Sequence, residues 1–288
     1  YVLSFYNQGQ MQRALDEASK LLNQYPNAFI LHNVCGITNA DLGQYDAAIE
    51  SYTRALTINP NDAQVHFNMG VLLDDTGDLK GAIESYNKAL IAKADYADAY
   101  VNKGMTLNCD GDQEGALESF NQAIKVQPGR ADAHYNMGNL LRNKGELDAA
   151  LESLRQVIKI NPDHAEAYNS IGAVLRDSKN LETAIDSFKQ ALTIKPNYAE
   201  AHYNMGLVLQ DKGDLEAAID SYEKAIKIKP DYVEAFYNLG VALQFKGEID
   251  DAVSSYKKAL SIKPDYFQAQ VNIGHALREK GEDLQAQD

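Results

Sequence analysis

The sequence has few cysteines and no long hydrophobic run, and each scarcity excludes a class of protein. Its 288 residues include two cysteines, Cys35 and Cys109, which lie far apart in the chain. We therefore expect no disulfide and a reducing compartment. No apolar run approaches the roughly 18 residues that a membrane span needs. No secretory signal is visible at the N-terminus, so we expect a cytoplasmic protein without a membrane span.

Basic residues are also scarce. The sequence holds 41 Asp and Glu against 27 Lys and Arg, which gives a formal net charge of -14. A surface that binds nucleic acid needs a basic face to neutralise the phosphates. We therefore expect no nucleic-acid partner.

Proline and glycine, by contrast, recur at a fixed interval of 34 residues. All seven prolines stand on one such row, whose single gap is filled by Ala94. The prolines are Pro26, Pro60, Pro128, Pro162, Pro196, Pro230 and Pro264. Two further rows take 16 of the 19 glycines. The first is Gly36, Gly70, Gly104, Gly138, Gly172, Gly206, Gly240 and Gly274, and the second is Gly9, Gly43, Gly77, Gly111, Gly145, Gly213, Gly247 and Gly281, with Lys179 in its one gap.

The positions of these residues predict two helices in each repeat. Gly213 can adopt the left-handed backbone conformation that ends a first helix. The carboxylate of Asp214 favours the positively polarised N-terminus of a second helix. Pro230 cannot continue the second helix. Asp231, like Asn61, Asp163 and Asn197, is expected to cap the next first helix. The predicted fold class is all-α, built of antiparallel helix pairs with short turns.

The small and apolar residues at fixed positions of the repeat resemble the pattern of a known family. Gly206, Ala218, Tyr222, Ala225 and Pro230 resemble the tetratricopeptide repeat pattern. The position that usually holds Trp carries other residues here: His32, His66, Tyr100, His134, Tyr168, His202 and Phe236.

The resemblance implies a right-handed α-solenoid over residues 1–288. It comprises a partial repeat (1–28), seven full repeats (29–266) and a second partial repeat (267–288). Both ends fall inside the pattern, so we expect the chain to be a segment of a longer protein. The resemblance further implies that the variable positions of the first helices line a concave binding groove.

The most regular of these variable positions holds asparagine in Asn68, Asn102, Asn136, Asn204, Asn238 and Asn272, whereas Val34 and Ser170 interrupt the row. A carboxamide offers both a donor and an acceptor, so it can bind a peptide backbone irrespective of its side chains. The row resembles the asparagine ladder in the repeat arm of O-linked N-acetylglucosamine transferase. The alternative is that these asparagines form hydrogen bonds within the scaffold.

Aromatic and arginine side chains accompany this row. Phe67, Tyr135, Tyr203 and Tyr237 directly precede asparagines, and Arg142 and Arg176 follow about two turns later. Such residues commonly anchor protein interfaces, although a tyrosine here could equally cover apolar surface. The acidic line Asp98, Asp132, Glu166, Glu200 and Glu234 could favour a basic ligand, but its first-turn positions also complement the helix dipole.

Residues for chemistry are sparse. The histidines are expected to pack or to be solvated, because His66, His134 and His202 lie two repeats apart and cannot share a metal. Cys109 has no adjacent base, and Gly81, Gly115 and Gly129, the glycines outside the two rows, form no phosphate-binding loop. On the second helices, pairs such as Glu50 with Arg54 predict a solvated outer face. We expect no catalytic, cofactor or metal site.

The sequence therefore predicts a non-enzymatic scaffold that binds a protein or an extended peptide. The expected binding residues are Asn68, Asn102, Asn136, Asn204, Asn238, Asn272, Tyr135, Tyr203, Tyr237, Arg142 and Arg176. The alternative is the substrate-docking arm of a larger enzyme, such as a glycosyltransferase, whose catalytic domain lies outside this segment. Self-association is also possible.

Overall fold

The computed structural model describes residues 2–287, with side chains described as far as residue 281. Over this range the chain forms seventeen helices and no strand, which confirms the all-α prediction. The first helices of the repeats are α1 (Val2–Asn7), α3 (Phe29–Asp41), α5 (Ala63–Asp75), α7 (Ala97–Asp110), α9 (Ala131–Asn143), α11 (Ala165–Asp177), α13 (Ala199–Lys212), α15 (Val233–Lys246) and α17 (Phe267–Gln287). The second helices are α2 (Met11–Gln24), α4 (Tyr45–Ile58), α6 (Leu79–Ala92), α8 (Gln113–Val126), α10 (Leu147–Ile160), α12 (Leu181–Ile194), α14 (Leu215–Ile228) and α16 (Ile249–Ile262).

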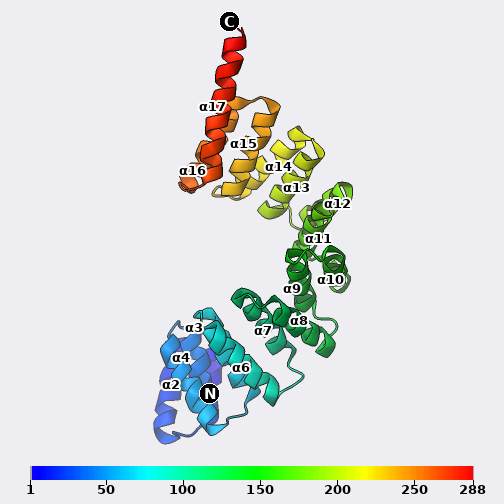
Figure 1. The fold of residues 1–288 in the computed structure, drawn as a ribbon. Helices are drawn as coiled ribbons and strands as arrows, with labels where there is room; N and C mark the ends of the chain where they lie inside the picture. The colour runs from blue at the N-terminus through cyan, green and yellow to red at the C-terminus, as the bar shows by residue number, and fades with distance from the viewer. Residues whose placement is uncertain (1, 288) are drawn as a thin grey trace. The chain divides into compact units, whose positions relative to one another are not determined.

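The chain divides into two compact units, Tyr1–Leu140 and Leu141–Asp288, whose boundary lies within α9. Within each unit a first helix packs on the second helix of its own repeat, and that second helix packs on the next first helix (Figure 1). First helices also contact the first helices of neighbouring repeats, as α3 contacts α5 and α13 contacts α15. Each unit is thus a stack of helical repeats, and the grouping of residues 1–288 into one solenoid stays a prediction.

The two helices of a repeat are held together by a bare glycine under an aromatic ring. A Cβ added to Gly206 would lie 2.5 Å from Cε1 of Tyr222, and the Tyr222 side chain is fully buried. Tyr52, Tyr86, Phe120, Phe188 and Tyr256 occupy the same position over the matching glycines. Alanines at the second-helix positions of Ala218 and Ala225 complete the contact, because both are fully buried. Close approach of the helices therefore depends on these small residues.

The turn between the two helices uses the second row of glycines as predicted. Gly213 has φ +87° and its N–H donates to Gln210 O, and Gly247 has φ +86°. Lys179 fills the gap in the row and adopts the same conformation with φ 63°, the one non-glycine residue with positive φ among those described. An L-residue is strained there because its Cβ approaches the backbone.

A side-chain cap of the second helix is confirmed at Asp214 and Asp78, whereas Glu248 at the same position forms no cap hydrogen bond. The predicted caps of the first helices are wrong by one residue. Asp78 and Asp214 accept from backbone N–H groups of α6 and α14. The first helices are capped by the residue that follows the predicted one, such as Asp62 before α5 and His164 before α11. Asn61, Asp163, Asn197 and Asp231 therefore lie one residue outside the cap.

Tyrosine occupies the cap position in other repeats and forms no side-chain cap there. Tyr232 precedes α15, and its ring centroid lies 5.0 Å from that of Tyr203. Lys229 Nζ lies 4.7 Å from the same ring. Packing of the ring replaces the cap hydrogen bond at this position.

Histidine at the usual Trp position has a structural role. Its Nε2 contacts the carbonyl oxygen of the proline in the preceding turn, at 2.7 Å in His32, 2.8 Å in His66 and 3.0 Å in His202. Because a carbonyl only accepts, Nε2 carries the proton. This hydrogen bond ties each first helix to the loop before it and confirms that these histidines pack in the scaffold.

The last segment departs from the repeat. Helix α17 continues through Gly281 to Gln287, whereas Gly281 was expected to end a first helix. Glycine permits a left-handed turn but does not impose one, and a helical backbone through Gly281 keeps its intrahelical hydrogen bonds.

Substitution of Gly206 tests the packing of glycine against the aromatic ring. Gly206→Ala is expected to lower the free energy of unfolding by about 1–3 kcal/mol, because the buried Tyr222 ring has no room to move. Gly129→Ala is the matched control, since an added Cβ there meets nothing within 4 Å. Urea unfolding followed by circular dichroism measures both, and equal midpoints would contradict the packing argument.

Relief of strain at Lys179 should stabilise the protein. Lys179→Gly is expected to raise the free energy of unfolding by about 1 kcal/mol, because glycine adopts positive φ without a Cβ clash. The reverse change Gly213→Lys at the matching position should destabilise by a similar amount. A lower thermal midpoint for Lys179→Gly than for the parent would refute the strain.

Candidate functional site

The predicted site residues lie on one surface within each unit, the first-helix face. We use this term for the side of the first helices that carries the asparagine row together with the aromatic and arginine side chains beside it. Its asparagines, Asn68, Asn102, Asn136, Asn204, Asn238 and Asn272, are all partly buried. They occupy the same position in their respective helices, as the 34-residue interval requires.

In the unit Leu141–Asp288 these asparagines donate to the preceding repeat. Nδ2 of Asn204 lies 3.0 Å from Asn169 Oδ1, and Nδ2 of Asn238 lies 3.0 Å from the Tyr203 hydroxyl. Nδ2 of Asn272 lies 3.2 Å from the Tyr237 hydroxyl. Each carboxamide nitrogen thus links neighbouring first helices. The Oδ1 atoms of these three asparagines accept no bond from the described residues.

In the unit Tyr1–Leu140 the asparagines of the row form different hydrogen bonds or none. Asn68 Oδ1 accepts from Gln64 Nε2 at 2.9 Å within the same helix. The carboxamides of Asn102 and Asn136 form no hydrogen bond with the described residues. Val101 precedes Asn136 by one repeat at the position of Tyr203, so the hydroxyl that would receive the bond is absent there.

The aromatic residues beside the row pack against other rings. The Tyr203 centroid lies 6.0 Å from that of Tyr222 and 5.0 Å from that of Tyr232. Phe67 and Tyr237 have equivalent neighbours, whereas Tyr135 is partly buried on α9. Burial, helped by the Glu234 carboxylate, raises the pKa of Tyr203 to about 12. Its hydroxyl therefore stays protonated while it accepts from asparagine.

Both predicted arginines form ion pairs with the following repeat. Nε of Arg142 lies 2.7 Å from Asp177 Oδ2, and Nε of Arg176 lies 2.6 Å from Asp211 Oδ2. These partners were missed from the sequence, although a further 34-residue row predicts them. The acids on this row are Asp41, Asp75, Asp177, Asp211 and Glu279.

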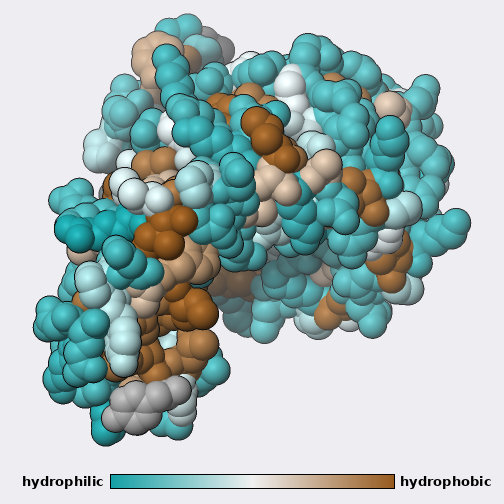
Figure 2. All heavy atoms as spheres, turned by 90° about the horizontal axis from the view of Figure 1, so that it is seen from below, coloured by the Kyte–Doolittle hydropathy of each residue, from teal (hydrophilic) through white to brown (hydrophobic). Residues whose placement is uncertain are grey.

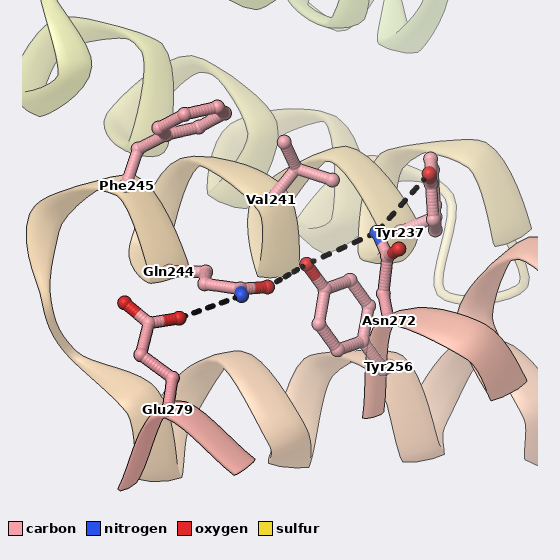
Figure 3. A pocket seen from close by; sticks show the side chains of 7 residues that line it. All are labelled: Tyr237, Val241, Gln244, Phe245, Tyr256, Asn272 and Glu279. Atoms are coloured by element: carbon pink, nitrogen blue, oxygen red, sulfur yellow. Dashed lines mark hydrogen bonds between the residues drawn. The ribbon is translucent and has the colours of Figure 1, made fainter. Parts of the chain in front are cut away.

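A pocket of about 450 Å³ opens on this face between α15 and α17 (Figure 3). A hydrogen-bonded chain crosses it: Asn272 Nδ2 lies 3.4 Å from the Tyr256 hydroxyl, which donates to Gln244 Oε1 at 3.0 Å. Nε2 of Gln244 donates to Glu279 Oε2 at 2.9 Å. Val241 and the exposed ring of Phe245 form the apolar part of its lining.

A second pocket, of about 440 Å³, lies at the matching place between α3 and α5. Its apolar lining includes Ile37, Val71 and Phe67, and its charged lining residues are Asp41 and Asp75. The Tyr6 hydroxyl donates to Asp41 Oδ2 at 2.8 Å. Two repeats in different units therefore form the same kind of pocket, with aliphatic and aromatic walls and a carboxylate.

The other candidate residues serve the scaffold. Among the side chains that the structure describes, no three His, Cys, Asp or Glu gather to hold a metal ion. His164 Nδ1 accepts from Ala167 N–H at 3.2 Å and so caps α11. Three acids of the first-turn line form ion pairs: Asp98 and Asp132 with Arg130, and Glu166 with Lys195. The Lys195 hydrogen bond lowers the pKa of Glu166.

The surface is mainly hydrophilic on the side shown in Figure 2, with hydrophobic residues in patches between polar ones. The predicted outer pairs are present, with Arg54 to Glu50 at 2.8 Å and Lys88 to Glu84 at 2.7 Å. No helix within the described range is both long and apolar enough to cross a membrane.

Removal of Asn272 tests the inter-repeat hydrogen bond. Asn272→Ala leaves the Tyr237 and Tyr256 hydroxyls without their donor, so the free energy of unfolding should fall by about 0.5–1.5 kcal/mol. Asn102→Ala is the matched control with no such bond and should change stability by less than about 0.5 kcal/mol. Equal losses in urea unfolding would refute the linking role of this row.

Models of known families match most of the repeats. The model described as TPR repeat matches residues 38–77, 110–143, 138–177, 172–213 and 206–244, more than half of the chain. Models described as Tetratricopeptide repeat match residues 2–28, 63–96 and 233–266. No curated protein matches the chain.

Solved structures give the same family. MamA is 31% identical over 57% of this chain and 96% of its own, with a TM-score of 0.51. YrrB, described as a TPR protein with an unusual peptide-binding site, is 25% identical over 66% of this chain and 98% of its own, with a TM-score of 0.52. The Cut9–Hcn1 hetero-tetramer of the APC/C shares the fold. It is 16% identical over 93% of this chain and 52% of its own, with a TM-score of 0.67. The chain belongs to the tetratricopeptide repeat family.

Proposed function

We propose that this chain is a protein-interaction scaffold that binds an extended polypeptide along its first-helix face. The observation that carries the proposal is that the Oδ1 atoms of Asn204, Asn238 and Asn272 accept no hydrogen bond from the described residues. A peptide N–H is a suitable donor to such an oxygen, and recognition of the backbone does not depend on the peptide's sequence.

The repeat spacing suits an extended chain. Packed helices lie roughly 10 Å apart, and an extended peptide advances about 3.3 Å per residue. One asparagine would therefore meet every third peptide residue. Because Asn238 and Asn272 are each held by a tyrosine hydroxyl, their orientation is set before the peptide arrives, which lowers the entropy lost on binding.

Aromatic and arginine side chains supply the remaining contacts in this proposal. Tyr135, Tyr203 and Tyr237 directly precede asparagines of the row and are partly buried. Arg142 and Arg176 each use Nε–H for an aspartate, and a guanidinium has five N–H donors. The other N–H groups would bind peptide carbonyls.

The family supports this kind of activity. YrrB, at 25% identity, is described as having a peptide-binding site. A substrate-docking arm of a larger enzyme would use the same face for the same binding step. The likeness to the arm of O-linked N-acetylglucosamine transferase rests on the asparagine row alone.

Replacement of three asparagines tests the proposal. Asn136→Ala/Asn204→Ala/Asn238→Ala should weaken binding of an extended peptide by about 10–1,000-fold, because each of the three lost hydrogen bonds contributes about 0.5–1.5 kcal/mol. The probe is a pool of fluorescent peptides of random sequence, from which a binder is selected on the parent chain. Binding is measured by fluorescence anisotropy.

Asn87→Ala/Asn121→Ala, which changes asparagines of the second helices, is the matched control and should bind as the parent does. Helicity of both variants is checked by circular dichroism. A folded triple variant with unchanged affinity would contradict the proposed use of the asparagine row.

A further inference from the structure

The carboxylates of the first-helix face differ in whether a cation of the chain compensates them. Asp177 and Asp211 each receive an arginine from the preceding repeat. Asp41, Asp75 and Glu279 stand at the same repeat position, but none forms an ion pair with a described residue.

The residue one repeat earlier explains the difference. Arg142 and Arg176 precede the paired aspartates, whereas Tyr6 precedes Asp41, Ala40 precedes Asp75 and Gln244 precedes Glu279. Tyr6 and Gln244 donate neutral hydrogen bonds to their acids. Ala40 donates nothing from its side chain. A neutral donor leaves the negative charge in place.

The uncompensated acids are also the ones that line the two pockets. Among the residues whose side chains are described, Glu279 is the one charged residue lining the pocket between α15 and α17, and Asp41 and Asp75 are the charged ones lining the pocket between α3 and α5. The negative charges of Asp41 and Glu279 also act on the buried hydroxyls of Tyr52 and Tyr256. Burial, and after it the charge of Asp41, raises the pKa of Tyr52. Burial chiefly, with a smaller contribution from the charge of Glu279, raises the pKa of Tyr256 to about 12.

We infer that these two pockets receive arginine or lysine side chains, so that the extended partner is a basic peptide. This inference rests on the proposed function and names the class of its ligand. A cationic head would meet the carboxylate, and its aliphatic stem would pack on the apolar walls, Val241 and Phe245 in one pocket and Ile37 and Val71 in the other.

The dimensions and chemistry of the pockets fit such a side chain. Long basic side chains bury their stems on apolar surface while the charged head finds polar partners. Phe245 is 74% exposed, and its ring beside a cation would add a cation–π contact. The net charge of -14 would also accelerate the approach of a basic partner.

The test uses the full chain and three labelled probes. Each is an 18-residue peptide of glycine and serine that carries, at every third position, arginine, its neutral analogue citrulline, or glutamate. Fluorescence anisotropy in 0.15 M salt measures the affinity. The arginine peptide should bind at least about tenfold more tightly than the citrulline peptide, since charge-assisted hydrogen bonds contribute about 1.5–3 kcal/mol each. The glutamate peptide should bind most weakly.

Loss of the carboxylates should remove this preference. Glu279→Gln and the double variant Asp41→Asn/Asp75→Asn should each weaken binding of the arginine peptide about three- to tenfold and leave the citrulline peptide unchanged. The combined variant Asp41→Asn/Asp75→Asn/Glu279→Gln should bind both peptides alike. All changes are nearly isosteric, and circular dichroism verifies folding.

A matched control separates the pockets from the general negative charge. Glu50→Gln/Glu84→Gln/Asp220→Asn removes the same charge from exposed pairs of the second helices. This control should keep the arginine preference within about twofold. An equal loss of preference in the control and in the combined variant would overturn the inference, because the attraction would then be non-specific.

Failure of the inference and failure of the proposed function give different results. Suppose that the parent binds the arginine and citrulline peptides equally and that the triple asparagine variant binds neither. This result would overturn the inference that the ligand is basic but would leave the peptide-binding function standing. If the parent bound no peptide, neither these three probes nor any of the random pool, the peptide-binding function itself would fail, and the inference with it.

Discussion

The contact between an aromatic ring of the second helix and a bare glycine of the first helix is the constraint on which the rest depends. At Gly206 and its equivalents a single Cβ would lie closer to the ring than van der Waals contact allows. Because the ring is buried, the two helices of a repeat have one separation and one rotation. That rotation directs the opposite side of each first helix away from the core, which leaves a polar face with asparagines at a fixed interval.

A second set of contacts joins one repeat to the next. The asparagine–tyrosine and arginine–aspartate contacts connect first helices of neighbouring repeats, and the histidine–proline carbonyl bond ties a first helix to the loop before it. The two former contacts lie on the first-helix face itself, so the residues that hold the repeats in register are also candidates to meet a ligand. Their atoms differ in use: the amide oxygens of Asn204, Asn238 and Asn272 accept no hydrogen bond from the described residues, and the acids without an arginine keep an uncompensated charge. The proposed function assigns binding to these groups.

The repeat length, the helix pairs and the glycine turns were predictable from the sequence because each follows from one residue's steric property. Glycine permits positive φ, proline ends a helix, and a small residue permits close packing. The cap of α5 was misplaced by one residue because Asn61 and Asp62 suit that role equally. The end of α17 was predicted wrongly because glycine permits a turn at Gly281 without imposing one. The partners of Arg142 and Asn238 needed three-dimensional register, although the row from Asp41 to Glu279 carries part of that signal in the sequence.

A crystal structure of the chain with the arginine-bearing peptide tests the central claim most directly, namely that the first-helix face is the binding surface. The account predicts an extended peptide whose backbone N–H groups donate to asparagine Oδ1 atoms such as those of Asn204 and Asn238. It further predicts an arginine beside Glu279 in the pocket between α15 and α17. A peptide seated on the second helices, or a helical peptide that leaves the asparagine oxygens free, would contradict it.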